Sequence, residues 1–382
     1  MHHLRRLFAI SCLALVSVHA HAQYVGFGSV TNGATNCPGY TTYRVINLSD
    51  SGAGSFRDAV SQGCRLVQFD VAGEIRLTST LLLQQSFLTV DGSSAPSPGI
   101  TISAPNIRIA IQPSPATGPA HDIVIHHLRI VGAGGDLESA DILELDGQDA
   151  AVYNIVFDHI TAVAASDGAF DVWGEVHDVT LSNNLIRDMI KAAHFSRNTQ
   201  VRQNFTIHRN VYARNNERQI RMRYNNRRID FTNNVIYGWG WFEAGAAGLD
   251  LPSDAGYTPS INIENNIYHH VSPHGSPDDA IIFNSSSFPG SIYFNGNSLP
   301  QGENDAISTA GRTSIPAAAQ VQLLPLSELG DSVVLCAGTV YPTQDELTLL
   351  NSINGAIGGS GMADCGGLPS PRPEPPTDLI AE

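Results

Sequence analysis

The chain has 382 residues, and its 36 acidic residues outnumber its 21 lysines and arginines, so the formal net charge is -15 at pH 7. This acidic balance excludes the broad basic surface that sequence-independent nucleic-acid binding needs. The cations are also concentrated, because eleven of the 21 lie between Arg187 and Arg228, which predicts one local patch for a specific anionic partner.

The first 22 residues have the layout of a secretory leader. A basic start, MHHLRR, is followed by the apolar run LFAISCLALVSV and by small residues before Gln23. The apolar run is too short to cross a bilayer, and no later stretch has the roughly 20 uninterrupted apolar residues of a membrane helix. We therefore expect a signal peptide over 1–22 and a soluble protein, secreted to an extracellular or periplasmic compartment, with no membrane partner.

Four cysteines remain once Cys12 leaves with the leader: Cys37, Cys64, Cys336 and Cys365. An even number in an oxidising compartment predicts two disulfides, for which three connectivities exist. We favour Cys37 with Cys64 and Cys336 with Cys365, because pairs that are close in sequence would fasten the two ends of the domain. Zinc binding is the weaker alternative, since no CxxC spacing occurs.

A short helix is predicted near the N-terminus, within DSGAGSFRDAVS at 50–61. Ser55 is a suitable N-cap, and Phe56 and Val60 would lie on one apolar face. Such a helix would cover the open end of a stack of strands, whose unpaired edge would otherwise invite pairing with other chains.

Short segments of alternating apolar residues recur through the middle of the chain: VTLSNNLI, FTIHRNVY, DFTNNVIY and NIENNIY. Their shared asparagines are Asn184, Asn210, Asn234 and Asn266, and Asn297 continues the series, at intervals of 26, 24, 32 and 31 residues. No amphipathic helix separates the segments, which argues against βαβ units. The pattern predicts an all-β, right-handed parallel β-helix whose coils stack, with asparagines bonding from coil to coil. A β-propeller is the alternative, but it needs more strand and turn signals in each repeat.

We expect one elongated domain over 23–365, because the sequence shows no linker in its middle and stacked coils need no single large core. The last stretch, GGLPSPRPEPPTDLIAE at 366–382, is rich in proline and charge and is predicted to be a disordered tail. We expect the protein to be a monomer.

The coil period also aligns charged residues. Asp141, Asp167, Lys191 and Arg218 follow one another at intervals of 26, 24 and 27, and Asp171 lies in the same coil as Asp167. Stacked about 4.8 Å apart, the four would form a column roughly 14 Å long, enough for two or three sugar units. Clustered carboxylates repel one another unless a cation neutralises them, and such oxygen ligands suit Ca²⁺. The alternative is a set of solvated turns without a function.

Several segments together resemble the pectate lyases of polysaccharide lyase family 1. They run in order from INLSDSGAGSFRDAV and RLVQFDVAGEIRL through LTVDGSSAPSPGI, NIVFDHITA and VTLSNNLI to FTIHRNVYARNNERQIRMR and FTNNVIYGWG. The resemblance covers roughly residues 44–270. It implies a parallel β-helix, and an enzyme that cleaves polygalacturonate, an acidic polysaccharide, by β-elimination with Ca²⁺.

The resemblance also implies roles for individual residues. It makes Asp141, Asp167 and Asp171 the calcium ligands, Lys191 the lysine that binds the substrate carboxylate, and Arg218 the base. Arg223, together with Arg221, would hold an adjacent carboxylate by paired hydrogen bonds.

Three positions depart from the family pattern. Ser139 stands where a further acidic ligand is expected, with Glu138 as the nearest substitute. Ile220 replaces the proline that usually follows the arginine base, and Arg209 replaces a histidine. These positions bear on the calcium affinity and on the shape of the binding loop.

Three alternatives stay open. A pectin lyase or another polyuronate lyase would share the fold and the elimination chemistry. A hydrolase would use carboxylates as acid and base, for which the sequence offers only Asp278 and Asp279. A noncatalytic β-helix that binds polyanions would tolerate exchange of Lys191 and Arg218 for other cations.

Overall fold

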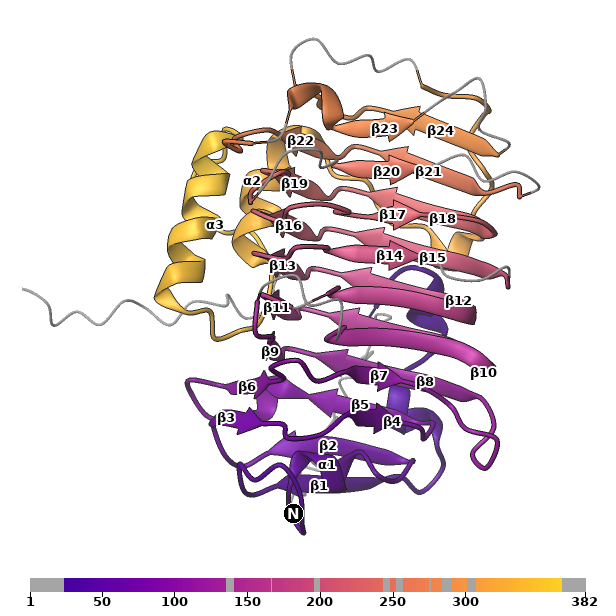
Figure 1. Cartoon of the computed structure of the whole chain (residues 1–382), viewed down its shortest axis with the longest axis vertical. Helices are drawn as coiled ribbons and strands as arrows, with labels where there is room; N and C mark the ends of the chain where they lie inside the picture. The colour runs from indigo at the N-terminus through magenta and orange to yellow at the C-terminus, as the bar shows by residue number, and fades with distance from the viewer. Residues whose placement is uncertain are drawn as a thin grey trace, which may run out of the picture.

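The chain folds as a stack of coils in which strands pair in parallel from one coil to the next (Figure 1). The computed structural model describes residues 24–134, 141–165, 167–195, 200–242, 248–251, 257–274, 276–283, 290–300 and 307–365. The predicted signal peptide, the predicted tail and positions 138 and 139 lie outside these ranges. The parallel β-helix that the asparagine spacing predicted is confirmed.

The coils present three faces. A 16-stranded sheet forms two of them, because β10 (Leu143–Asp158) and β12 (Phe170–Ser182) each run through the corner between the faces. The register shifts there between Gly147 and Val152, and Gly174 turns the corner with a left-handed φ of 73°. An eight-stranded sheet forms the third face.

The first face contains the early parts of β10 and β12. Its other strands are β4 (Leu81–Leu83), β7 (Ile109–Ile111), β14 (Ala193–Phe195), β17 (Arg221–Met222), β20 (Leu249–Leu251) and β23 (Ile281–Phe283).

The second face contains the later parts of β10 and β12. Its other strands are β1 (Thr41–Val45), β2 (Arg65–Phe69), β5 (Leu88–Asp91), β8 (Ala120–His126), β15 (Arg202–His208), β18 (Asn226–Thr232), β21 (Ser260–Glu264) and β24 (Ser291–Asn295).

The third face is built from short strands of three or four residues. They are β3 (Gly73–Arg76), β6 (Ile100–Ser103), β9 (Arg129–Val131), β11 (Thr161–Val163), β13 (Leu185–Arg187), β16 (Val211–Ala213), β19 (Val235–Tyr237) and β22 (Ile267–His269).

The core lies inside the coils and consists of apolar columns. One column on the second face runs in register through Phe157, Leu181, Ile207, Phe231, Ile263 and Phe294, all of them buried. Alternation along each strand places every second residue in such a column, so each coil buries its apolar side chains against the coils on either side.

The predicted asparagine ladder is present in full. The Nδ2 of Asn184 donates to Oδ1 of Asn210. The same bond repeats from Asn210 to Asn234, from Asn234 to Asn266 and from Asn266 to Asn297, at distances between 2.8 and 3.1 Å. Each Oδ1 also accepts the backbone N–H of the preceding asparagine. The ladder therefore satisfies buried polar groups at the turn between the second and third faces.

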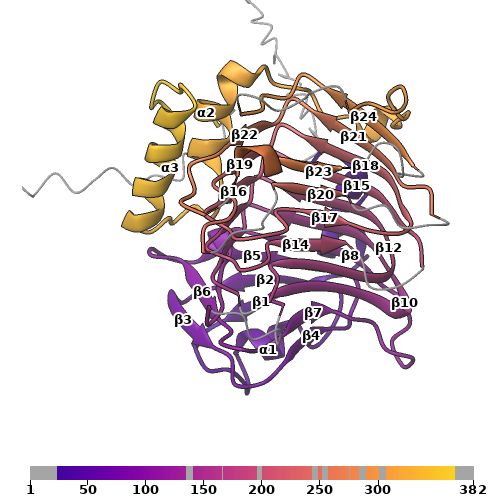
Figure 2. The same cartoon turned by 45° about the horizontal axis from the view of Figure 1, so that its top comes forward.

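Elements from the C-terminal part cover the third face (Figures 1 and 2). They are η6 (Leu326–Glu328), α2 (Leu329–Ser332), η7 (Val334–Cys336) and α3 (Gln344–Ala356), whose apolar side chains pack on the outward residues of β13, β16, β19 and β22. A capping box starts α3, since Thr343 and Glu346 satisfy each other's backbone N–H groups. Arg129 of β9 anchors this helix by a 2.5 Å ion pair with Glu346.

Other segments cover the outside of the second face. Near the N-terminus, η1 (Phe27–Val30) docks by hydrogen bonds from Phe27 N–H to Thr206 and from Gly28 N–H to Thr180, and η2 (Gly33–Asn36) follows. Residues 307–320, with η5 (Ala317–Ala319), lie farther along the stack. Two further 3₁₀ turns, η3 (Gly92–Ser94) and η4 (Pro277–Asp279), connect strands.

The predicted helix near the N-terminus and the predicted pairing of the cysteines are confirmed. Helix α1 (Phe56–Ala59) is capped by the Ser55 side chain, which accepts the Asp58 N–H, and it lies at the N-terminal end of the stack (Figure 1). The disulfides are Cys37–Cys64 and Cys336–Cys365. In the described part of the chain, no helix combines the length and apolar character that a membrane crossing requires.

Candidate active site

The outside of the first face carries a row of side chains in register. Phe170 and Val172 point into the core on either side of Asp171, so Asp171 points outward, and the same alternation holds in the strands that follow. This outer row consists of Glu144, Asp171, His194, Arg221, Asp250 and Ile282. Among the residues that the structure describes, the covering segments lie on the other two faces, which leaves the first face for a large ligand.

Two carboxylates, that of Asp171 in this row and that of Asp141 beside it, lie close to Gly168. Oδ1 of Asp141 accepts the Gly168 backbone N–H at 2.8 Å. A side-chain carbon built on Gly168 would lie 2.5 Å from Oδ1 of Asp171 and 2.9 Å from Oδ1 of Asp141. Glycine at this position therefore leaves room for two nearly buried carboxylates.

Burial and the neighbouring acids disfavour the ionisation of Asp171. Burial raises the pKa of Asp171 well above its usual range, and the neighbouring charges of Asp141, Asp167 and Glu144 raise this pKa further, while Arg218 lowers it. Carboxylates that are held together away from water favour a proton or a cation. We call Asp141, Asp167 and Asp171 the acid cluster.

Lys191 lies against the acid cluster. Its Nζ is 3.3 Å from Oδ1 of Asp167, and the lysine side chain is 8% exposed while that of Asp167 is 26% exposed. The Lys191 backbone also forms a parallel bridge with Glu217 on the next coil. Lys191 is therefore placed between the acid cluster and the turn that carries Arg218.

Arg218 occupies a strained turn. Its φ of 53° is in the left-handed region, which costs a residue other than glycine about 1 kcal/mol. A backbone hydrogen bond from Ala193 N–H to Arg218 O, at 2.8 Å, helps to hold this turn. The Nε of Arg218 lies 3.5 Å from Oε1 of Glu217, and its charge acts on Asp171.

The other two predicted arginines follow along the same face. Arg221 is in the outer row, with its Nε 3.0 Å from Oδ2 of Asp250. The Arg223 guanidinium lies 4.8 Å from the ring centre of Tyr224, a cation–π distance. The structure thus places Arg218, Arg221 and Arg223 along one coil, which stacks on the coil of Lys191.

Sequence reasoning missed a second charged group on this face. Arg108 binds both oxygens of Glu144 and also donates to Oδ2 of Asp146 at 2.9 Å. Gln112 donates to that same Asp146 oxygen at 2.9 Å. These carboxylates are nearly buried, and the single guanidinium of Arg108 pairs with both of them.

The predicted column and the outer row are different lines of residues on the same face. Asp171 belongs to the outer row with Glu144 and His194, whereas Lys191 pairs with Glu217, the residue before Arg218. Asp167 nevertheless reaches Lys191 and acts on Asp171, so the structure brings Asp141, Asp167, Asp171 and Lys191 together with Arg218 nearby. Their catalytic and binding roles stay predictions.

The acid cluster fits calcium in its chemistry, because Asp141 and Asp171 offer carboxylate oxygens in the space beside Gly168. Within the described ranges, no group of three or more histidine, cysteine, aspartate or glutamate side chains is arranged to hold a metal ion. Asp167, the third predicted ligand, is paired with Lys191 instead. Calcium binding by all three aspartates therefore stays a prediction, and it requires Asp167 to be shared with Lys191 or released from it.

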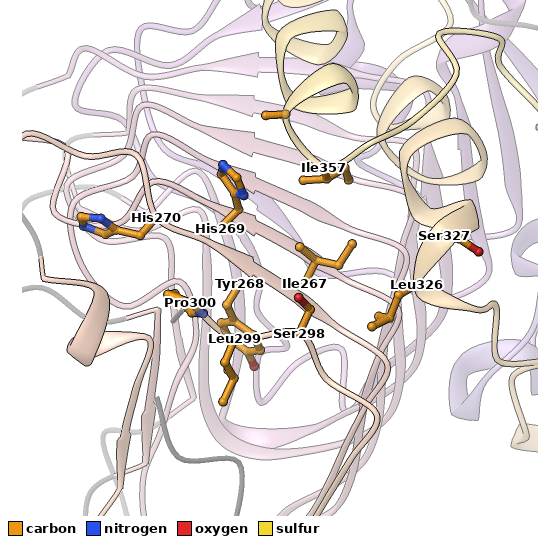
Figure 3. Close-up of a pocket in the computed structure, with 11 residues that line it drawn as sticks. Ile267, Tyr268, His269, His270, Ser298, Leu299, Pro300, Leu326, Ser327 and Ile357 are labelled. Carbon is orange, nitrogen blue, oxygen red and sulfur yellow. The ribbon is translucent and has the colours of Figure 1, made fainter. Parts of the chain in front are cut away.

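A separate pocket of about 450 Å³ opens at the C-terminal end of the third face (Figure 3). Its lining includes Ile267, His269, Ser298, Leu326 and Ile357. None of the predicted site residues lines this pocket, so it is distinct from the acid cluster.

Comparison with known proteins gives relatives in one group. Probable pectate lyase C of Aspergillus oryzae is 32% identical over 235 residues, which cover 60% of this chain and 52% of the relative. Probable pectate lyase C of Aspergillus fumigatus is 29% identical over 266 residues, covering 67% of this chain and 58% of the relative. The chain thus spans about half the length of the curated relatives it matches. No family model matches it.

Solved structures share the fold. The major allergen of cedar pollen superposes with a TM-score of 0.63 at 18% identity, covering 83% of this chain and 92% of that one. A pectate lyase from a Bacillus species, in complex with trigalacturonate, superposes with a TM-score of 0.54 at 17% identity, covering 82% of this chain and 98% of that one. The chain is therefore related in sequence to curated pectate lyases and has the β-helix of solved pectate lyases, which confirms its resemblance to polysaccharide lyase family 1.

Proposed function

We propose that the chain is a calcium-dependent pectate lyase, which cleaves α-1,4-polygalacturonate by β-elimination to 4,5-unsaturated oligogalacturonates. The observation that carries this proposal is the contact of Lys191 with an acid cluster in which Asp141 and Asp171 share the space beside Gly168. The relatives named pectate lyase and the Bacillus enzyme in complex with trigalacturonate support it.

The first face suits an acidic polysaccharide in its dimensions and its charge. Coils stack about 4.8 Å apart, so successive residues of the outer row can meet successive sugar units of a chain laid along the stack. Lys191 lies on one coil, Arg218 and Arg221 lie on the next, and the three supply cations beside the acid cluster. A uronate chain offers one carboxylate for each such unit.

Elimination removes the proton at C5 of a galacturonate, and its electron pair forms the C4–C5 double bond as the C4–oxygen bond breaks. The leaving oxygen takes a proton to become the hydroxyl of the released chain. Because C5 is next to a carboxylate, negative charge accumulates on that group during proton removal. Lys191 would donate hydrogen bonds to this carboxylate and favour the charge that develops there. Asp141, Asp171 and Asp167 would hold a Ca²⁺ ion, which would supply further positive charge at the same group.

Arg218 is the base in this proposal. A guanidinium is normally protonated, so its neutral form needs neighbouring positive charge and exclusion of water. Lys191 lies on the preceding coil, and a polymer bound over the first face would exclude water. Glu217, 3.5 Å from the Arg218 Nε, acts in the opposite direction and favours the protonated form. Binding of substrate must therefore weaken the contact between Arg218 and Glu217.

Arg223 and Arg221 would hold the carboxylate of an adjacent sugar. Their guanidinium groups can bind a carboxylate with two parallel hydrogen bonds, which fixes the orientation of the sugar. The cation–π contact of Arg223 with Tyr224 holds the guanidinium plane in place before substrate arrives.

The proposal includes export and a single catalytic domain. The two disulfides fit an oxidising compartment, and the leader-like start at 1–22 would direct the chain there. We propose a monomeric domain over 23–365 followed by a mobile tail at 366–382.

The direct test is ultraviolet absorbance of unsaturated products, measured on polygalacturonate with calcium and then with a chelator. We expect absorbance with calcium and its loss with chelator. Arg218→Lys should abolish turnover, while Arg214→Lys should keep it. Arg214 is a matched control, because it also has a left-handed backbone, with φ of 55°, and pairs with Asp188, outside the acid cluster.

The outcomes separate the candidate functions. Reducing ends without absorbance would indicate a hydrolase. Absorbance only on esterified polymer, unaffected by chelator, would indicate a pectin lyase. Binding of polygalacturonate without any product, unchanged in Arg218→Lys, would indicate a noncatalytic polyanion-binding protein.

A further inference from the structure

We infer that the first face beyond Arg221, at Asp250 and Ile282, binds a methyl-esterified uronate in preference to a free uronate. This inference rests on the proposed function, and it assigns a substrate preference to one position of the binding face. Three observations carry it: the register of the outer row, the ion pair of Arg221, and the exposure of Ile282.

Register places the three side chains on consecutive coils. Arg221 pairs with Asp250, and Asp250 pairs with Ile282. Leu249 and Leu251, on either side of Asp250, are buried in the core, so Asp250 points outward like Asp171. The outer row therefore continues past the cations as one acidic and then one apolar residue.

The charge of Arg221 is already matched within the protein. Its Nε lies 3.0 Å from Oδ2 of Asp250, and the two side chains are 26% and 17% exposed. A free uronate next to Asp250 would bring a second carboxylate close to an acid. Two like charges at such a distance repel one another at a protein surface. A methyl ester has no charge, so it avoids this repulsion.

Ile282 gives the methyl group an apolar contact. Its side chain is 44% exposed, in a row whose other members are polar or charged. Covering a methyl group against such a side chain removes apolar surface from water and so favours binding. Around the acid cluster the opposite holds, because Lys191 and a bound cation favour a free carboxylate. Along the stack, the first face thus changes from favouring a charged sugar unit near the acid cluster to favouring an uncharged one near Ile282.

The test compares two polymers of equal length, unesterified polygalacturonate and highly methyl-esterified homogalacturonan. Asp250→Asn removes one charge and keeps the shape of the side chain. We expect its KM to fall about fivefold for the unesterified polymer and to stay within about twofold for the esterified one, as the loss of one partly exposed like charge predicts. Asp278→Asn, the same charge change in the exposed turn η4, should move neither KM.

A second variant keeps the inference testable if the first folds poorly. Ile282→Lys, at an exposed position, should lower KM for the unesterified polymer and raise KM for the esterified one. Equal shifts for both polymers, or no shift in either variant, would overturn the inference.

Binding measured by calorimetry separates this inference from the proposed function. In an Arg218→Lys background, Asp250→Asn should still bind unesterified oligomers about fivefold more tightly. If no polymer yields product but this difference in binding persists, the lyase proposal fails and the charge preference stands. If the oligomers bind equally to both proteins, the preference itself fails.

Discussion

Lys191 and Asp167 form an ion pair, 3.3 Å from Nζ to Oδ1, at the point where the acid cluster meets the cations of the next coils. Lys191 therefore has two predicted roles: it offsets the charge of a predicted calcium ligand, and it binds a substrate carboxylate. Removal of its charge should then have opposite effects on calcium binding and on catalysis.

We expect Lys191→Met to bind Ca²⁺ more tightly and to turn over substrate more slowly. Removal of one positive charge beside Asp167 should raise calcium affinity about tenfold, the size of one partly buried charge interaction. Turnover should fall at least about a hundredfold, because the carboxylate next to C5 loses a charged donor. Calorimetry with CaCl₂ and the absorbance assay check the two effects, with Arg214→Met as control. Unchanged or weaker calcium binding would show that Asp167 is no ligand.

Arg108→Ala should destabilise the fold. Glu144 and Asp146 are each 3% exposed and would lose the guanidinium that balances them. Breaking a buried ion pair on one side costs about 3 kcal/mol, which denaturant unfolding can measure. Arg44→Ala is the matched control, since Arg44 pairs with Asp70 at the surface and its loss should cost less than about 1 kcal/mol. Similar costs for both variants would contradict this account.

Asn210→Ala should lower the unfolding free energy as much as Arg108→Ala does, for a different reason. Asn210 Nδ2 donates to Asn234 and to Leu181 O, while its Oδ1 accepts from both nitrogens of Asn184. Alanine would leave several buried groups without partners, at a cost of about 3 kcal/mol or more in unfolding free energy. Asn297→Ala, at the partly exposed end of the ladder, should cost clearly less. Equal losses of unfolding free energy in Asn210→Ala and Asn297→Ala would show that the ladder is not the main polar support of the stack.

The ladder was predictable and the acid row was not, for one physical reason. A ladder uses the same residue type at the same turn in every coil, so its spacing is visible in the sequence. The outer row mixes residue types, and its members are unevenly spaced in the sequence, because the coils differ in length. Counting by near-equal intervals therefore could not show which residues face one another across coils, such as Asp171 and His194.

Contacts between coils could not be predicted from the sequence either. Nothing near Glu144 indicates that Arg108, 36 residues earlier, lies beside it, since only the register brings them together. The C-terminal helix α3 is a different case. Thr343 and Glu346 form a capping-box pattern that precedes an apolar run, and this local signal could have predicted the helix.

The pH dependence of stability offers a test far from the candidate site. Burial raises the pKa of Asp230 to about 6, and Glu264 adds to the rise, although Arg312 and Asn262 act against it. In the unfolded chain this carboxyl titrates near 3.8. Between these values the native state binds more protons than the unfolded state. The contribution of Asp230 to stability is therefore fully present below pH 3.8 and is lost as the pH rises through about 6.

Asp230→Asn keeps this position neutral at every pH, so the variant should become more stable than the parent as the pH rises from about 4 to about 6.5, by about 2 kcal/mol. Denaturant unfolding of both proteins at several pH values measures the difference. Buried His208, whose pKa is lowered to about 3 by burial, contributes the opposite slope, but it is common to both proteins and cancels. Asp278→Asn, in the exposed turn η4, should show no such trend. A difference that does not change with pH would mean that Arg312 holds Asp230 ionised in the folded state, and that the ion pair outweighs the cost of burial.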